Sequence, residues 1–176
     1  MSQAVFLSPH NDDETLFGAF TILGDRPRVI VCFRSVVQAQ QYGIPHAVRE
    51  AETAEALRCL GLEGYEQWTI SDAQPDWVRL HDQIAQIEAS VIYAPLPEAD
   101  GNAQHNRVGL MAAKLHGKVL YYATYTTKGK SREGRRVVFE PRWPWLKMKA
   151  LACYQSQATL PSTYDHFLRD QYEYLK

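Results

Sequence analysis

The chain has 176 residues, 45% of them hydrophobic, and a formal net charge of −1 at pH 7. A chain of this length can bury one substantial core, so we expect a single domain over residues 1–176. The near-zero charge gives no basic surface for nucleic acid, so we expect a small molecule as ligand rather than nucleic acid or a membrane. No segment has the pattern of a signal peptide or the roughly 20 apolar residues of a membrane span, so we expect a cytoplasmic protein. The composition leaves the oligomeric state open, a homo-oligomer included.

The first part of the chain alternates short apolar runs with helical patterns. "AVFLS" (4–8) and "RVIVCF" (28–33) are continuous apolar runs, which are typical of buried strands. The segment 13–25 between them has the spacing of a helix that ends near Gly24. A second helix is predicted over 46–62, because apolar residues recur there at helical spacing before the stop signal of a glycine.

The same alternation continues along the chain and sets the fold class. Strands are predicted at 65–70, 90–96 and 118–125, and helices at 75–89 and 103–117. Strands that alternate with helices predict a mainly parallel, Rossmann-like sheet with helices on both faces, a three-layer α/β/α domain. Such sheets bind ligands beyond the carboxyl ends of their strands, so we expect the functional residues at that edge.

After residue 126 the pattern changes to polar and basic residues. The segment 127–136, "TKGKSREGRR", predicts the tip of a hairpin or flap over 126–140, between "YYATYT" and "RVVFEP". Two terminal helices are expected, over 144–157 and 164–175.

The three cysteines indicate neither disulfides nor a thiolate metal site. They are odd in number, far apart in the sequence and flanked by apolar residues, so we interpret all three as buried thiols: Cys32, Cys59 and Cys153.

Polar residues crowd the end of the first predicted strand, where residues 9–14 read "PHNDDE". One interpretation is structural, because carboxylates and amides at the start of a helix accept free backbone N–H groups and complement the helix dipole. The other is functional: His10 and Asp13 are two ligands of one divalent metal, with Asp12 beside them as a general base. Taken alone, the segment does not decide between the two.

A catalytic zinc takes three protein ligands and leaves a position for water, so a third ligand is required. His105 follows the fourth predicted strand and therefore comes from a second loop on the same edge of the sheet as His10. The remaining histidines lie in or beside predicted helices and are interpreted as surface or helix-end residues: His46, His81, His116 and His166.

Four segments, in order along the chain, resemble one known family. "PHNDDE" (9–14) resembles the "HPDDE" signature of the PIG-L or LmbE-like deacetylases, and "QHNRVG" (104–109) resembles their segment "HPDHRAVG". "VREAETAEALRCLGL" (48–62) is similar to the helix that follows their second strand, and "ALACYQSQ" (150–157) to their late "YxSQ" segment. The resemblance spans nearly the whole chain, which is what a single LmbE-like domain would show.

The resemblance implies a metal-dependent hydrolase, usually with zinc, that removes an acetyl group from N-acetylglucosamine units; Fe²⁺ or another divalent ion is the alternative metal. Carried over by position, it implies that the metal ligands are His10, Asp13 and His105, that Asp12 is the base, and that Arg49 and Asp72 contact the sugar. The nucleophile would be a water molecule on the metal, whose pKa the metal would lower to roughly 7.

One position departs from the family pattern. Asn102 stands where many relatives have a histidine that helps to stabilise the tetrahedral oxyanion, and we expect Asn102 at the substrate. Asparagine donates a hydrogen bond but not a proton, and loss of an oxyanion donor costs about 10²- to 10³-fold in rate. Three alternatives therefore stay open: another donor such as a tyrosine, a different N-acyl amide of specialised metabolism as substrate, or a binding or regulatory relative with weakened catalysis.

Overall fold

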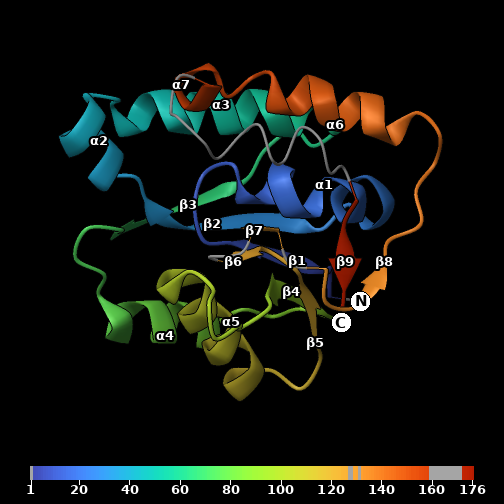
Figure 1. The fold of residues 1–176 in the computed structure, drawn as a ribbon. Coiled ribbons are helices and arrows are strands. Elements are labelled where there is room, and N and C mark those ends of the chain that lie inside the picture. Colours follow the sequence, from blue (N-terminus) through green and yellow to red (C-terminus); the bar gives the residue numbers. More distant parts are fainter. Residues whose placement is uncertain (1, 127–128, 131, 159–171) are drawn as a thin grey trace.

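The computed structural model describes residues 2–126, 129–130, 132–158 and 172–176, and its centre is one β-sheet. Five strands run parallel: β1 (Val5–Ser8), β2 (Arg28–Arg34), β3 (Glu66–Ser71), β4 (Ile92–Pro95) and β5 (Val119–Tyr122). Two short antiparallel strands extend the sheet, β8 (Arg135–Arg136) and β9 (Tyr174–Leu175). The strand order is β3-β2-β1-β4-β5-β9-β8 (Figure 1).

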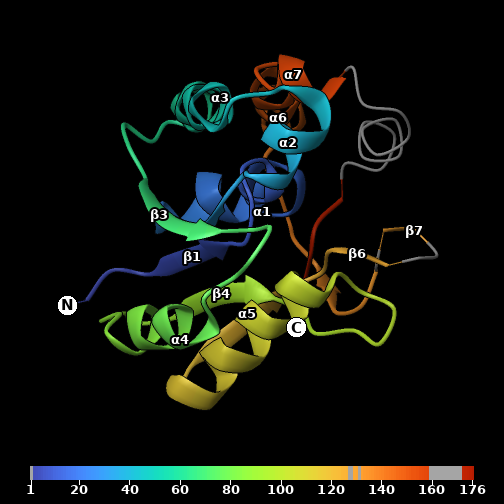
Figure 2. The same cartoon turned by 90° about the vertical axis from the view of Figure 1, so that its left-hand side faces the viewer.

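Helices cover both faces of this sheet, which confirms the three-layer α/β/α prediction (Figures 1 and 2). One face carries α1 (Asp13–Asp25), α2 (Val37–Tyr42), α3 (His46–Cys59), α6 (Trp143–Leu151) and α7 (Gln155–Ala158). The other face carries α4 (Trp77–Ala85) and α5 (Ala103–Leu115). Within the described ranges, we find no helix with the length and apolar character needed to cross a membrane.

Side chains of the parallel strands alternate between two apolar clusters. Phe6 on β1 packs with Phe17 and Leu57 on the α1 and α3 side, whereas its neighbour Leu7 packs with Leu80 on the α4 and α5 side. This alternation follows from the two-residue period of a strand. Both helical layers are thereby held against the sheet by buried apolar surface.

Two glycines allow the helices that carry site residues to approach the sheet closely. A Cβ atom on Gly18 of α1 would overlap the ring of Phe6, and one on Gly109 of α5 would overlap the carbonyl oxygen of Pro95. A side chain at Gly109 would collide with backbone, and one at Gly18 would require the Phe6 ring to move. The positions of α1 and α5 relative to β1 and β4 therefore depend on glycine.

The first predicted helix is confirmed, but two later predictions were wrong. α1 spans residues 13–25 as predicted, and Arg26, a residue with a left-handed φ of 47°, follows it. Residues 37–42 form α2, a helix that the sequence pattern did not predict. The helix predicted over 144–157 is two helices, α6 and α7, because the chain turns at residues 152–154 between them.

The C-terminal part of the chain differs most from the prediction. A short hairpin of β6 (Tyr125–Thr126) and β7 (Gly129–Lys130) exists, but Arg135–Arg136 pairs with β9 instead of returning to the hairpin. The reason is that β9 occupies the edge of β5, with Tyr122 opposite Leu175. Most of the helix predicted over 164–175 lies outside the described residues, and at Tyr174–Leu175 that prediction was wrong, since these residues are a strand.

The interpretation of the cysteines holds only in part. Cys32 is buried, as predicted. Cys59 and Cys153 are half-buried, and their Sγ atoms lie 3.9 Å apart although the residues are distant in the sequence. The packing of α3 against α6 brings these two free thiols together.

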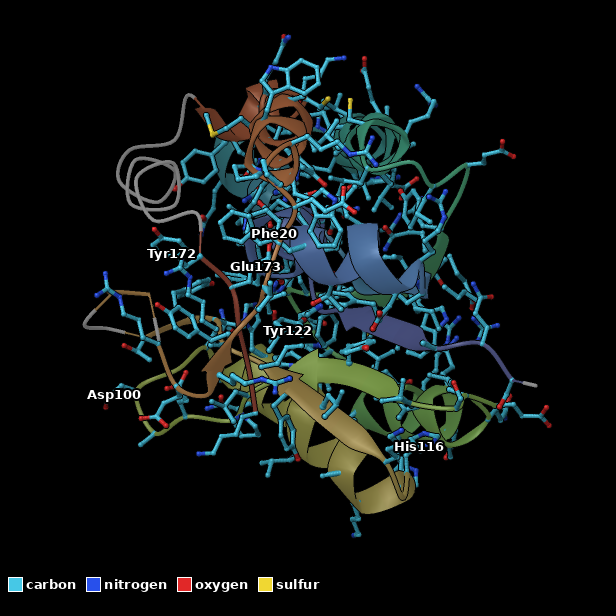
Figure 3. All side chains as sticks on the ribbon, turned by 90° about the vertical axis from the view of Figure 1, so that its right-hand side faces the viewer. Phe20, Asp100, His116, Tyr122, Tyr172 and Glu173 are labelled. Atoms are coloured by element: carbon cyan, nitrogen blue, oxygen red, sulfur yellow. The ribbon has the colours of Figure 1, made fainter. Side chains whose placement is uncertain are left out.

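A buried ion pair fixes the last residues of the chain to the middle of α1. Lys147 Nζ donates to Glu173 Oε1 at 2.7 Å and to the carbonyl oxygen of Leu16 at 2.8 Å. Glu173 also accepts a hydrogen bond from the backbone N–H of Phe20 at 2.9 Å, and Figure 3 shows the two residues side by side. Both charged side chains are 1% exposed, so each depends on the other for compensation of its charge.

We expect Lys147→Met to lower the free energy of unfolding by about 3–5 kcal/mol, because it leaves the Glu173 carboxylate buried without its cation. Urea denaturation measures this loss. The matched control is Lys149→Met on the same helix, whose side chain is exposed and whose loss should cost about 0.5 kcal/mol or less. Equal stability of the two variants would contradict the role assigned to the ion pair.

Candidate functional site

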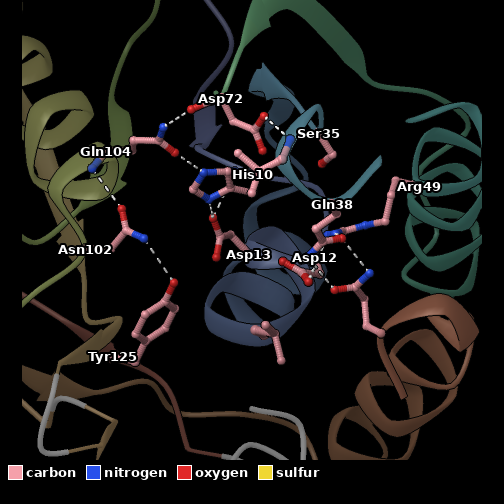
Figure 4. Close-up of a pocket in the computed structure, with 13 residues that line it drawn as sticks. His10, Asp12, Asp13, Ser35, Gln38, Arg49, Asp72, Asn102, Gln104 and Tyr125 are labelled. Atoms are coloured by element: carbon pink, nitrogen blue, oxygen red, sulfur yellow. Dashed lines mark hydrogen bonds and ion pairs between the residues drawn. The ribbon is translucent and has the colours of Figure 1, made fainter. Parts of the chain in front are cut away.

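A cavity of about 290 Å³ opens at the carboxyl ends of β1 and β4 (Figure 4). These strands are neighbours in the sheet, and the chain leaves them in opposite directions, to α1 on one face and α5 on the other. This is the switch point at which open α/β sheets bind their ligands. The cavity therefore lies where the sequence places the functional edge.

His10, Asp13 and His105, here called the His–Asp–His trio, meet at this cavity. Asp13 Oδ2 lies 3.2 Å from His10 Nδ1 and 3.0 Å from His105 Nε2, and the two nitrogens are 3.2 Å apart. His10 is in the turn after β1, Asp13 begins α1, and His105 is in the first turn of α5. The structure thus brings together all three residues that the sequence analysis proposed as metal ligands.

The trio matches the ligand preferences of a divalent ion. Its three ligand atoms lie within 4.8 Å of one another, and they are two imidazole nitrogens and one carboxylate oxygen. Zinc binds such a set and keeps a fourth position for water. Burial works against the charged forms of Asp13 and His10, but the two imidazoles hold the pKa of Asp13 well below its usual range, and Asp13 raises the pKa of His10.

Asp12 lies beside the trio and has an unusual backbone. It precedes α1 with φ 107° and ψ −29°, and its side chain makes no capping hydrogen bond to the helix. Its carboxylate instead accepts a hydrogen bond from Arg49 at 3.0 Å. Burial raises the pKa of Asp12 to about 7, although the positive charge of Arg49 opposes this change. A non-glycine residue with such a φ costs about 1–3 kcal/mol and is found mostly at functional sites.

The polar residues of segment 9–14 differ in where their side chains lie. Asn11 and Glu14 are buried and have structural roles. Asn11 donates to Thr53 at 3.0 Å, and Glu14 accepts a hydrogen bond from Tyr154, in the late segment of the chain. Asn11 and Glu14 therefore fix the turn, whereas Asp12 and Asp13 between them line the cavity.

The guanidinium of Arg49 is held by hydrogen bonds within the protein, one of them to Asp12. It is 2% exposed and donates to the carbonyl oxygen of Asn11, to Asp12 and to the amide oxygen of Gln38. Gln38 and Gln157 bind each other in both directions, at 3.0 and 2.9 Å. Neither glutamine was predicted from the sequence; for Gln157 the available signal was its place at the end of the "YxSQ"-like segment.

Asp72 and Gln104 form the opposite wall of the cavity. Asp72 Oδ1 accepts hydrogen bonds from the backbone N–H groups of Val36 and Val37 at 2.7 and 2.9 Å, so this carboxylate supports the start of α2. Gln104 bridges the backbone carbonyl oxygen of Asp72 and the ring of His10, at 2.6 and 2.5 Å. Gln104 was also missed, because a glutamine in the first turn of a helix carries no distinguishing signal.

Asn102 has a structural task that the sequence analysis did not assign to it. Its Oδ1 caps α5 by accepting from the backbone N–H groups of Gln104 and His105, at 2.8 and 3.3 Å. Its Nδ2 donates to the hydroxyl of Tyr125 at 3.3 Å. Tyr125 lines the cavity, and its ring meets the His105 ring edge-on with centroids 5.3 Å apart. Figure 4 shows Asn102 between Gln104 and Tyr125.

Solved structures share the fold of this chain at low sequence identity. The conserved protein TT1542 from Thermus thermophilus is 20% identical, with a TM-score of 0.69 over 92% of this chain and 82% of its own. The N,N′-diacetylchitobiose deacetylase from Pyrococcus horikoshii is 18% identical, with a TM-score of 0.68 over 96% and 76%. The 4-carboxy-2-hydroxymuconate hydratase GalB from Pseudomonas putida KT2440 is 16% identical, with a TM-score of 0.68 over 96% and 84%.

No curated protein matches the chain significantly. The model of the family described as "PIG-L: GlcNAc-PI de-N-acetylase" matches residues 5–116, which is more than half of the sequence and includes the whole trio. The chain therefore belongs to the PIG-L family.

Proposed function

We propose that this protein is a metal-dependent hydrolase that removes the acetyl group from an N-acetylglucosamine-type sugar or its conjugate. Membership of the PIG-L family supports a deacetylase-type hydrolase, and members of this family are metal-dependent. The observation that carries the proposal is the position of Asp12, a carboxylate next to the trio that binds Arg49 instead of capping its helix.

The trio fits the metal that this chemistry needs. His10 Nδ1, Asp13 Oδ2 and His105 Nε2 would hold the ion. Two imidazoles and one carboxylate suit zinc, and the same set also suits Fe²⁺. When bound, such an ion activates water by lowering its pKa and polarises the amide oxygen.

Asp12 would act as base and then as acid. Its carboxylate takes a proton from the attacking water while the water oxygen bonds to the amide carbon. It then gives this proton to the nitrogen as the C–N bond breaks, so that acetate and a free amine leave. Arg49 keeps the carboxylate in place at 3.0 Å, and Asp13 is committed to the two imidazoles.

Tyr125 is the donor that we assign to the amide oxygen. A phenol is protonated at neutral pH, and this one lines the same cavity as the trio. Asn102 contributes through Tyr125, because its amide donates to the phenol oxygen and so orients the hydroxyl. In this proposal, Tyr125 and Asn102 together stabilise the oxyanion, a role for which a histidine at position 102 would otherwise be expected.

The size of the cavity limits the part of the substrate that enters it. About 290 Å³ is just below the range of about 300–1,000 Å³ that is usual for ligand sites. One sugar ring with its acetyl group suits this volume better than a larger conjugate. Arg49 and Asp72 line the cavity and are the residues that we assign to the sugar hydroxyls.

We expect zinc-loaded protein to release free amine from members of a panel of N-acetylglucosamine derivatives. Asp12→Asn should lower kcat by about 10²- to 10⁴-fold, while its zinc content stays at the wild-type level. Amine release and metal analysis on the same samples measure both. Asp82→Asn, at an exposed position on α4, is the matched control. Turnover by Asp12→Asn at the wild-type rate would rule out this base, and zinc-loaded protein without turnover on any sugar would favour another amide or a non-catalytic relative.

Removal of the metal should abolish turnover, and added zinc should restore it. His105→Ala should lose both bound metal and activity, because two ligands remain. His81→Ala, at a partly exposed position outside the cavity, should keep both. Metal content per chain, measured beside amine release, tests the assignment; activity of His105→Ala without metal would refute it.

Tyr125→Phe should lower kcat by about 10²-fold with little change in KM, because the hydroxyl acts on the charge that develops at the amide oxygen. Steady-state kinetics on the best panel substrate separates the two constants. Tyr42→Phe, at an exposed position on α2, should leave both unchanged. A rise in KM at constant kcat would show instead that Tyr125 binds the ground state and the transition state equally.

A further inference from the structure

The amide of Gln104 connects two parts of the site. Its Nε2 lies 2.6 Å from the carbonyl oxygen of Asp72, and its Oε1 lies 2.5 Å from His10 Nε2 (Figure 4). Gln104 itself is in the first turn of α5, next to His105. It therefore touches the outer nitrogen of one trio histidine from the helix that carries the other.

The backbone contact determines which way the amide points. A carbonyl oxygen can only accept a hydrogen bond, so the NH₂ group of Gln104 must be the end that faces Asp72. The amide oxygen then faces His10, and an amide oxygen can also only accept. His10 Nε2 must therefore carry a hydrogen.

This arrangement selects one tautomer of His10. A neutral imidazole with its hydrogen on Nε2 has its lone pair on Nδ1. His10 Nδ1 is the atom that lies 3.2 Å from both Asp13 Oδ2 and His105 Nε2, where the ligand atoms of the trio gather. The lone pair thus points at the place where an ion would be bound.

The other histidine of the trio lacks such support among the residues that the structure describes. His105 Nδ1 is buried and has no hydrogen-bond partner there. Histidines that bind metals usually donate their outer N–H to a fixed acceptor, which orients the ring and strengthens the ligand. Within the described part of the chain, His10 is the trio histidine with this arrangement.

We propose that Gln104 is a positioning residue that fixes the tautomer and the ring orientation of His10, and so makes His10 Nδ1 a metal ligand. Asp72 takes part through its backbone: its carbonyl orients the amide, while its carboxylate supports α2. The inference rests on the proposed function, because it assumes that the trio binds a metal.

Two substitutions isolate the oxygen that faces His10. Gln104→Met removes both hydrogen bonds at similar volume. Gln104→Glu also loses the donation to Asp72 but keeps an acceptor for His10, so the difference between the variants reports that acceptor. Gln86→Met, at an exposed position after α4, is the control for the exchange itself.

The first measurement is zinc affinity by competition with a chelator, which needs no turnover. We expect Gln104→Met to bind zinc about 10- to 100-fold more weakly, and both Gln104→Glu and Gln86→Met to stay within about threefold of wild type or bind more tightly. The second measurement is the ¹⁵N spectrum of the imidazoles in zinc-loaded protein. It should show His10 bound through Nδ1 with hydrogen on Nε2 in wild type, and a mixture of coordination through Nδ1 and Nε2 in Gln104→Met.

Unchanged zinc affinity together with an unchanged His10 spectrum in Gln104→Met would overturn the inference, as would equal losses in the Met and Glu variants. Zinc binding without amine release would sink the proposed function and leave the role of Gln104 standing. Wild-type protein that binds no zinc would overturn both.

Discussion

A buried guanidinium organises the corner of the molecule that contains the site. Arg49 is 2% exposed, and a charge at that depth is tolerated only where acceptors surround it. The carbonyl of Asn11, the carboxylate of Asp12 and the amide of Gln38 supply them. Because these acceptors come from the turn after β1 and from α2, the turn is held against α3. The left-handed backbone of Asp12 persists because contacts on several sides determine it.

The site is assembled from two helical layers on opposite faces of the sheet. The layer of α1 and α3 brings Asp12 and Arg49, and α5 on the other face brings Gln104 and His105. The distances within the cavity therefore depend on how closely each layer packs on β1 and β4. Glycines lie at both close contacts, Gly18 against the Phe6 ring and Gly109 against the Pro95 carbonyl, so the packing of each helix on the sheet affects the geometry of the site.

The sequence was sufficient for the layers and for the trio, because strand direction and the handedness of connections leave few topologies and bring the ends of β1 and β4 to one edge. It was not sufficient for contacts that depend on where a side chain points. Gln104 has the pattern of an ordinary first-turn residue, and Gln38 lies in a segment without periodicity. At Tyr174–Leu175 the local pattern favoured a helix, but pairing with the free edge of β5 decided the structure.

The consecutive acids Asp12, Asp13 and Glu14 make the start of α1 a place where folding and cation binding are linked. All three are largely withdrawn from water. The two imidazoles compensate Asp13, whereas the helix N-terminus and Arg49 offset only part of the charge of the other two. Burial accordingly raises the pKa of both Asp12 and Glu14 above the usual range. A divalent cation held by the trio would bring two positive charges to this corner and favour the ionised form of Asp12 that accepts a proton. Without a cation, the repulsion among these buried acids disfavours the folded state. For the same reason, a cation bound by the trio would stabilise the folded state.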